Sequence, residues 1–81
     1  REVFNELEFV NKRGNLLRFD RLIIDKREVI VVDFKTGEER NEHYLRQLKE
    51  YLEVAKDIWI DKDIRGFIIY FDSQEVSEVL L

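Results

Sequence analysis

Val29-Ile30-Val31-Val32-Asp33-Phe34-Lys35-Thr36-Gly37 is the stretch that decides the fold. Its apolar, β-branched run is typical of a central strand that is buried on both faces, and it ends at a glycine. Asp33 and Lys35 are two residues apart, so a strand places their side chains on the same face. The sequence therefore predicts a carboxylate and an ammonium side by side where a buried strand leaves the core.

A second β-rich run, Leu16 to Ile24, precedes this strand, and the short connection between the two predicts an antiparallel hairpin. If Lys26 and Arg27 are the turn residues, Asp20 lies directly opposite Asp33. Two facing carboxylates repel each other unless a cation lies between them, so this register points to a divalent metal ion. Lys and Arg are unusual turn residues, so a longer loop with a bulge is the alternative. A one-residue slip would then move Asp20 to the other face.

A first strand is predicted from Val3 to Val10, followed by a polar loop. A loop of three or five residues would place Glu6 opposite Asp20, whereas a loop of four would not, so Glu6 is a conditional third acid. Together the three strands form an antiparallel meander. Strand alternation places Val3, Leu7 and Phe9 on one face of the first strand.

A helix is predicted from Glu42 to about Lys56, with Asn41 as its N-cap. Its buried stripe consists of the apolar residues at helical spacing, which are Leu45, Leu48, Leu52 and Ala55. An adjoining stripe contains Tyr44, Gln47 and Tyr51. This second stripe either lines a cleft above the strand ends or consists of ordinary boundary residues.

Residues 57 to 64 are expected to be a helix end and a loop with Trp59 packed inward. Gly66 to Phe71 is the last strong strand, and a crossover through the helix makes it parallel to the Val29 strand. Asp72-Ser73 turns the chain into a weak edge strand, Glu75 to Val79. The predicted class is α/β (α+β), with an antiparallel three-stranded meander, a helix, a parallel strand and an edge strand.

The chain has 81 residues, no cysteine, a single histidine and a formal net charge of −4. This length suits one domain, residues 1–81, with one modest core. Without thiolates, a metal ion would be held by oxygen or by His43, and carboxylate and carbonyl oxygens suit Mg²⁺ or Mn²⁺. The negative charge argues weakly against an autonomous nucleic-acid binder, although a larger parent chain could supply a basic surface.

The absence of methionine leads us to expect a fragment of a larger chain. No apolar run approaches membrane-spanning length and no signal peptide is visible. We therefore expect a soluble, cytoplasmic protein with no membrane partner.

Two acids and a lysine at a strand end are the parts needed for metal-assisted phosphodiester hydrolysis. A lone Asp-x-Lys is weak evidence, but the facing acid, the strand context and the following Thr36-Gly37 strengthen it. The alternative is an ordinary salt bridge between Asp33 and Lys35 at a strand end.

Three short segments follow one another along the chain: Arg18-Phe19-Asp20-Arg21-Leu22, Asp33-Phe34-Lys35-Thr36-Gly37 and Gln47-Leu48-x-x-Tyr51. Their order and spacing resemble the PD-(D/E)XK nuclease superfamily, and in particular its RecB-type nuclease domains. The chain is most similar to the C-terminal nuclease domain of UvrD/AddA-like helicase-exonucleases of bacterial double-strand-break repair. The resemblance extends from about Glu6 to Phe71.

The resemblance implies a restriction-endonuclease-like core with a metal-dependent nuclease site. Asp20 and Asp33 would be ligands of Mg²⁺ or Mn²⁺, and the carbonyl oxygen of Phe34 would be a further ligand. Lys35 would be the catalytic lysine.

Further residues also match the family. Gln47 and Tyr51 correspond to its helix motif, which lies beside the site and helps to position DNA or the catalytic groups. Glu6 resembles the acid of the family's first strand. Two features depart from the family: Leu17 stands where a glycine is common, and the helix that should precede the first strand, often with a His or acidic ligand, is not in this sequence. The fragment would then hold an incomplete site.

The function implied by the resemblance is a metal-dependent DNA nuclease, the exonuclease module of a helicase-nuclease in DNA repair and recombination. Its expected partners are DNA and the helicase domains of the same or an associated chain, in the bacterial cytoplasm. One alternative is a catalytically inactive, nuclease-like module that binds DNA or acts as a scaffold. The other is a resolvase or a restriction-type endonuclease.

Overall fold

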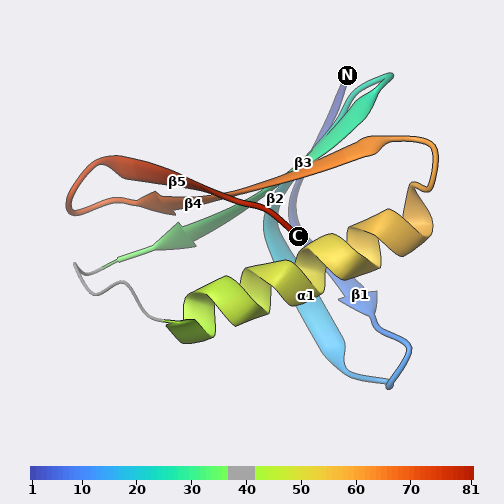
Figure 1. Ribbon diagram of the computed structural model, residues 1–81, viewed down its shortest axis with the longest axis horizontal. Helices are drawn as coiled ribbons and strands as arrows, with labels where there is room; N and C mark the ends of the chain where they lie inside the picture. The colour runs from blue at the N-terminus through green and yellow to red at the C-terminus, as the bar shows by residue number, and fades with distance from the viewer. Residues whose placement is uncertain (37–41) are drawn as a thin grey trace.

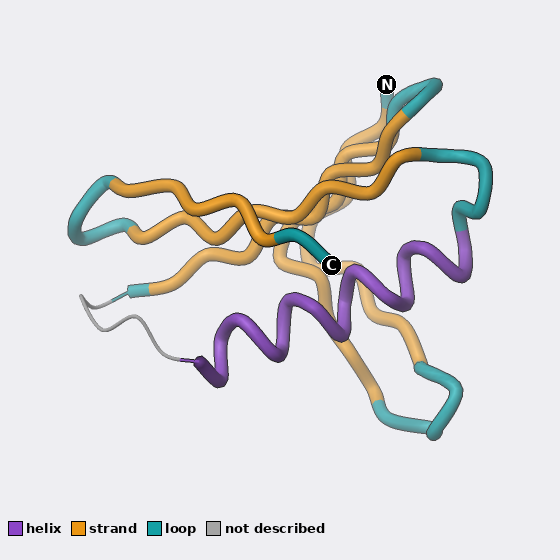
Figure 2. Tube along the Cα trace, viewed as in Figure 1, coloured by secondary structure: helices purple, strands orange, loops and turns teal. Residues whose placement is uncertain are grey.

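Residues 1–36 and 42–81 are described by the computed structural model, which has five strands and one helix. Figure 1 shows the helix crossing one side of the strands, and Figure 2 shows the same view with the helix in purple and the strands in orange. The elements are β1 (Glu2–Val10), β2 (Leu16–Ile24), β3 (Glu28–Lys35), α1 (Glu42–Ile58), β4 (Asp63–Tyr70) and β5 (Glu75–Val79).

The strands form one mixed sheet in the order β1-β2-β3-β4-β5. Only β3 and β4 are parallel, as expected for strands that are joined through a helix. In the β2–β3 hairpin Ile24 pairs with Val29 and Leu22 pairs with Val31, so the register deduced from the two-residue turn is confirmed. The expected α+β class, the meander and the edge strand β5 are confirmed as well.

The helix packs on the sheet through a buried stripe made of Leu48, Tyr51, Leu52 and Ala55. Leu45 was expected in this stripe, but it is 40% exposed. Tyr51 packs the edge of its ring on Phe19 of β2, which turns the buried stripe toward Tyr51 and away from Leu45. The helix approaches β4 closely at Gly66, where the lack of a side chain leaves room for Leu52. A Cβ atom on Gly66 would lie 2.7 Å from a Leu52 methyl. The predictions for Asn41 and for the connector before it fall outside the described residues.

The first strand changes its core-facing side at Glu6. Sequence alternation places Val3 on the core face with Leu7 and Phe9. This is wrong for Val3, which is 52% exposed, because Phe4 packs against the core instead. Glu6 has a φ of 55°, in the left-handed region that glutamate rarely adopts, and the alternation shifts at this residue.

The segment between α1 and β4 is a short loop, and Trp59 packs inward from it as expected. The Trp59 ring meets Phe9 of β1 edge-on, with 6.2 Å between the ring centroids. The following strand begins at Asp63, three residues earlier than predicted, since Asp63 already pairs with Glu28 at the start of β3.

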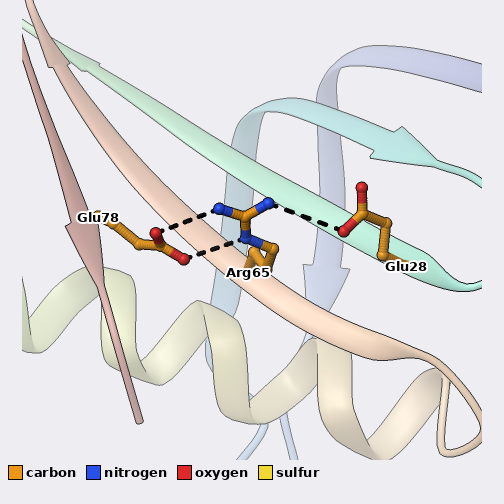
Figure 3. Close-up of polar contacts among 3 residues, drawn as sticks. All are labelled: Glu28, Arg65 and Glu78. Carbon is orange, nitrogen blue, oxygen red and sulfur yellow. Dashed lines mark hydrogen bonds and ion pairs between the residues drawn. The ribbon is translucent and has the colours of Figure 1, made fainter.

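The sheet face opposite α1 carries a charged cluster formed by Arg65 of β4, Glu78 of β5 and Glu28 of β3 (Figure 3). The Arg65 guanidinium donates two hydrogen bonds to the Glu78 carboxylate, at 3.1 and 3.2 Å, and lies 3.9 Å from Glu28. Further along β4, the same face carries the apolar side chains of Phe67 and Ile69. Within the described ranges, no helix has the length and apolar character needed to cross a membrane.

Candidate functional site

The pairing between β2 and β3 stops one residue short of the two predicted acids. Arg21 and Val32 are the last pair in the ladder, so Asp20 and Asp33 occupy the next position on each strand. Beyond this point β2 and β3 diverge, and Figure 1 shows α1 crossing the region where they separate. The hairpin therefore places both acids at a fork between two strands.

A hollow of about 370 Å³ lies at this fork. Strand β2 contributes every second residue of its first half, strand β3 contributes its last three residues, and α1 contributes two residues one turn apart. The lining residues are Leu16, Arg18, Asp20, Asp33, Phe34, Lys35, Gln47 and Tyr51. Six of the seven residues that the sequence singles out are thus brought to one place, and Glu6 is not among them.

The two carboxyl groups are held by different contacts. The backbone N–H of Phe34 donates a 2.9 Å hydrogen bond to Asp20 Oδ2, and this bond replaces the strand pairing that is lost at the fork. Asp33 is 3% exposed. Its carboxyl group lies close enough to that of Asp20 to share a hydrogen bond. Its Oδ2 atom is buried and has no hydrogen-bond partner among the described residues. Buried carboxylate oxygens are normally satisfied, so this atom is suited to an added cation.

Lys35 projects its ammonium between β3 and α1. Its Nζ atom lies 3.3 Å from Asp33 Oδ2 in an ion pair that lacks hydrogen-bond alignment. The same Nζ donates a 3.1 Å hydrogen bond to Gln47 Oε1 and lies 4.6 Å from the centre of the Tyr44 ring. The ion pair foreseen as the structural alternative is therefore present. This ion pair is part of a larger set of polar contacts, which includes Gln47 of α1.

The second helix residue of the hollow, Tyr51, is buried beneath the acids. Burial raises its pKa, and the negative charges of Asp33 and Asp20 raise it further. The hydroxyl group therefore stays protonated and can donate a hydrogen bond at the floor of the hollow.

The two carboxyl groups differ in pKa: that of Asp33 is raised and that of Asp20 is lowered. Burial, together with the neighbouring Asp20 carboxyl, raises the pKa of Asp33 from 3.8 to about 7, although the Lys35 ammonium opposes the rise. Burial would also raise the pKa of Asp20, but hydrogen bonds from Asp33 and the Phe34 amide, with the charges of Lys35 and Arg18, hold it below its usual value. The pair therefore retains one proton, chiefly on Asp33, over a range in which free aspartates are ionised.

The donor set of the fork fits a small divalent cation. Two carboxylates and a carbonyl are oxygen ligands of the kind that Mg²⁺ and Mn²⁺ prefer, and Mg²⁺ commonly keeps several waters besides one or two carboxylates. In residues 1–36 and 42–81, no group of three or more Asp, Glu or His side chains converges on one point. Glu6 lies level with Asp20 along the β1–β2 register, but it is exposed and its backbone turns at this position.

Sequence reasoning missed the contribution of Arg18 and Leu16 to the hollow. The available signal was the strand alternation, because Leu16, Arg18 and Asp20 occupy alternate positions of β2. His43, which was considered as a metal ligand, does not line the hollow.

Comparisons with protein-family models, with curated proteins and with solved structures found no significant match. The class of the protein therefore has to be argued from the fold and from the fork itself.

Proposed function

We propose that this chain is a metal-dependent DNA nuclease domain with a restriction-endonuclease-like core. The observation that carries the proposal is the buried Asp33 Oδ2 atom, which accepts no hydrogen bond although it lies beside Asp20 and Lys35. A carboxylate oxygen in this state gains from a cation, and the adjacent lysine suits a phosphate group. A purely structural ion pair would not need the second carboxyl group, the helix glutamine or the open hollow.

In this proposal Asp20 and Asp33 hold a Mg²⁺ or Mn²⁺ ion, with the Phe34 carbonyl as a further oxygen ligand. When bound, the ion supplies positive charge that polarises a phosphoryl oxygen and makes water more acidic. Lys35 neutralises negative charge that develops on the phosphate or orients the attacking water. Gln47 keeps the Lys35 ammonium at the site through its 3.1 Å hydrogen bond.

The proposed context is the exonuclease module of a helicase-nuclease in bacterial DNA repair. The sequence motifs support this context, with helicase domains of the same or an associated chain as partners in the cytoplasm. The Gln47 to Tyr51 segment supports it further, since both residues reach the hollow from one side of α1. The net charge of −4 agrees with a module that depends on partner domains for much of its DNA affinity.

The proposal is tested by cleavage of linear DNA with Mg²⁺ or Mn²⁺. Asp33→Ala and Lys35→Ala should each lower the rate by about 100-fold or more, because each removes charge that acts on the reacting phosphate. The matched control is Lys26→Ala, which removes an exposed lysine from the β2–β3 turn at the other end of the sheet and should cleave normally. Circular dichroism would verify that each variant is folded. Cleavage that persists in both site variants would exclude the nuclease assignment, and DNA binding without metal-dependent cleavage by the unaltered chain would favour the inactive module.

A further inference from the structure

One cation of the hollow, Arg18, is exposed. Arg18 lies on β2 two residues before Asp20 and lines the same hollow. Its neighbours Leu17 and Phe19 point to the opposite face and are buried in the core. The Arg18 side chain is exposed and lies near Asp20, because both residues line the hollow and the Arg18 charge helps to lower the pKa of Asp20.

The Arg18 guanidinium differs from the other arginines of the sheet in its contacts. Arg21 donates a 2.9 Å hydrogen bond to Asn5, and Arg65 is paired with Glu78. Across the described parts of the chain, the exposed side chain of Arg18 makes no hydrogen bond or ion pair of its own. A free guanidinium beside two acids and a lysine is a ready donor for an anion.

The backbone at Arg18 is nevertheless held in place. Arg18 pairs with Glu8 in the β1–β2 ladder, and Tyr51 of α1 lines the hollow beside it. The β1–β2 ladder thus holds the backbone of β2 beside the fork. A long side chain on this anchored backbone can reach a ligand without moving the strand.

We propose that Arg18 is a substrate-positioning residue, which binds the phosphate of the nucleic-acid strand next to the phosphate that reacts at Lys35 and the ion held by Asp20 and Asp33. This inference rests on the proposed nuclease function. Two residues along a strand span about 7 Å, so Arg18 lies beside the ion-binding acids without joining them. The guanidinium offers two parallel N–H groups to one phosphate, and it should act on binding and register more than on the chemical step.

The test is the salt dependence of binding to a labelled single-stranded oligonucleotide, measured by fluorescence anisotropy with Mg²⁺ in a Lys35→Ala background that does not cleave. Arg18→Gln should lower the slope of log K against log salt by about 0.7, the value of one phosphate contact on a single strand. Arg18→Lys should keep most of the slope because it keeps the charge. The matched control is Arg27→Gln, which makes the same charge change at an exposed turn at the far end of β2 and should leave the slope unaltered.

A second readout uses cleavage by the chain with Lys35 intact. Arg18→Gln should raise KM several-fold while kcat stays near its original value, as expected for a contact made equally in the ground and transition states. An unchanged slope in Arg18→Gln, or an equal fall in Arg27→Gln, would overturn the role of Arg18 and leave the nuclease proposal standing. If the chain with Lys35 intact neither binds nor cuts the strand, the proposed function fails and takes this inference with it.

Discussion

The two faces of the sheet are built from the same strands and have different surroundings. Beneath α1, strands β3 and β4 bury Val29, Val31, Asp33, Ile68 and Tyr70. On the opposite face Val32 is buried, the other intervening residues are only partly covered, and Phe71 is 57% exposed. The partly covered residues are Ile30, Phe34, Phe67 and Ile69. The open face thus carries several apolar side chains beside its charged cluster, which is typical of strands meant for burial on both sides.

Whether a carboxyl group of this sheet has a raised or a lowered pKa depends on whether α1 covers it. Asp33 points beneath the helix, loses contact with water and acquires a raised pKa. The carboxylates of the open face, Glu28 and Glu78, meet Arg65 near water, and the arginine lowers the pKa of Glu78. Among the residues that the structure describes, the buried charged side chain is Asp33 on the covered face, and burial of its charge favours ion binding.

The largest effect that separates the two faces should come from a pair of neighbouring isoleucines. Ile68 is fully buried under α1, whereas Ile69, the next residue of β4, is on the open face and partly exposed. Ile68→Ala should lower the free energy of unfolding by about 4 kcal/mol, because it leaves a cavity in the core. Ile69→Ala should lower it by about 1 kcal/mol, since less surface is lost there.

Urea unfolding followed by circular dichroism measures both variants. Equal losses would mean that the open face is as well covered in solution as the face beneath α1.

A smaller effect should appear in the pH dependence of stability without metal. Because the folded pKa of Asp33 is raised to about 7, the folded state keeps a proton that the unfolded chain releases near pH 4. Stability from this group is fully present below pH 4 and is lost as the pH rises to 7, a fall of about 3 kcal/mol in the free energy of unfolding.

Asp33→Asn should abolish this fall, and Glu78→Gln on the open face should leave it in place. Unfolding in urea at several pH values in the presence of EDTA tests both expectations. A fall that survives in Asp33→Asn would assign the effect to other groups.

Much of the fold could be predicted because its signals are local. The apolar run of β3, the short hairpin before it and the helical spacing of Leu48, Leu52 and Ala55 each depend on neighbouring residues. The hairpin register also placed Asp20 level with Asp33, which is a site prediction made from strand geometry alone. The structure brings Asp20, Asp33, Phe34, Lys35, Gln47 and Tyr51 together, as expected.

The features that could not be predicted depend on tertiary contacts. Alternation along β1 fails at Glu6, where the backbone adopts a positive φ that no sequence pattern announces. Leu45 has the right spacing for the core, but the packing of Tyr51 on Phe19 turns the helix away from it. A strand that is apolar on both sides gives no information on which face the helix will cover.

We propose that Asp20 and Asp33, at the fork between β2 and β3, hold a divalent cation. The most direct test of this proposal is line broadening by substoichiometric Mn²⁺ in the amide NMR spectrum of the chain. We expect the signals of Asp20, Phe34 and Lys35 to broaden first and Asp33→Asn to abolish this broadening. Asp61→Asn, which removes an exposed acid in the loop after α1, should preserve it. Broadening that centres on other acids, or that is the same in Asp33→Asn, would contradict the account.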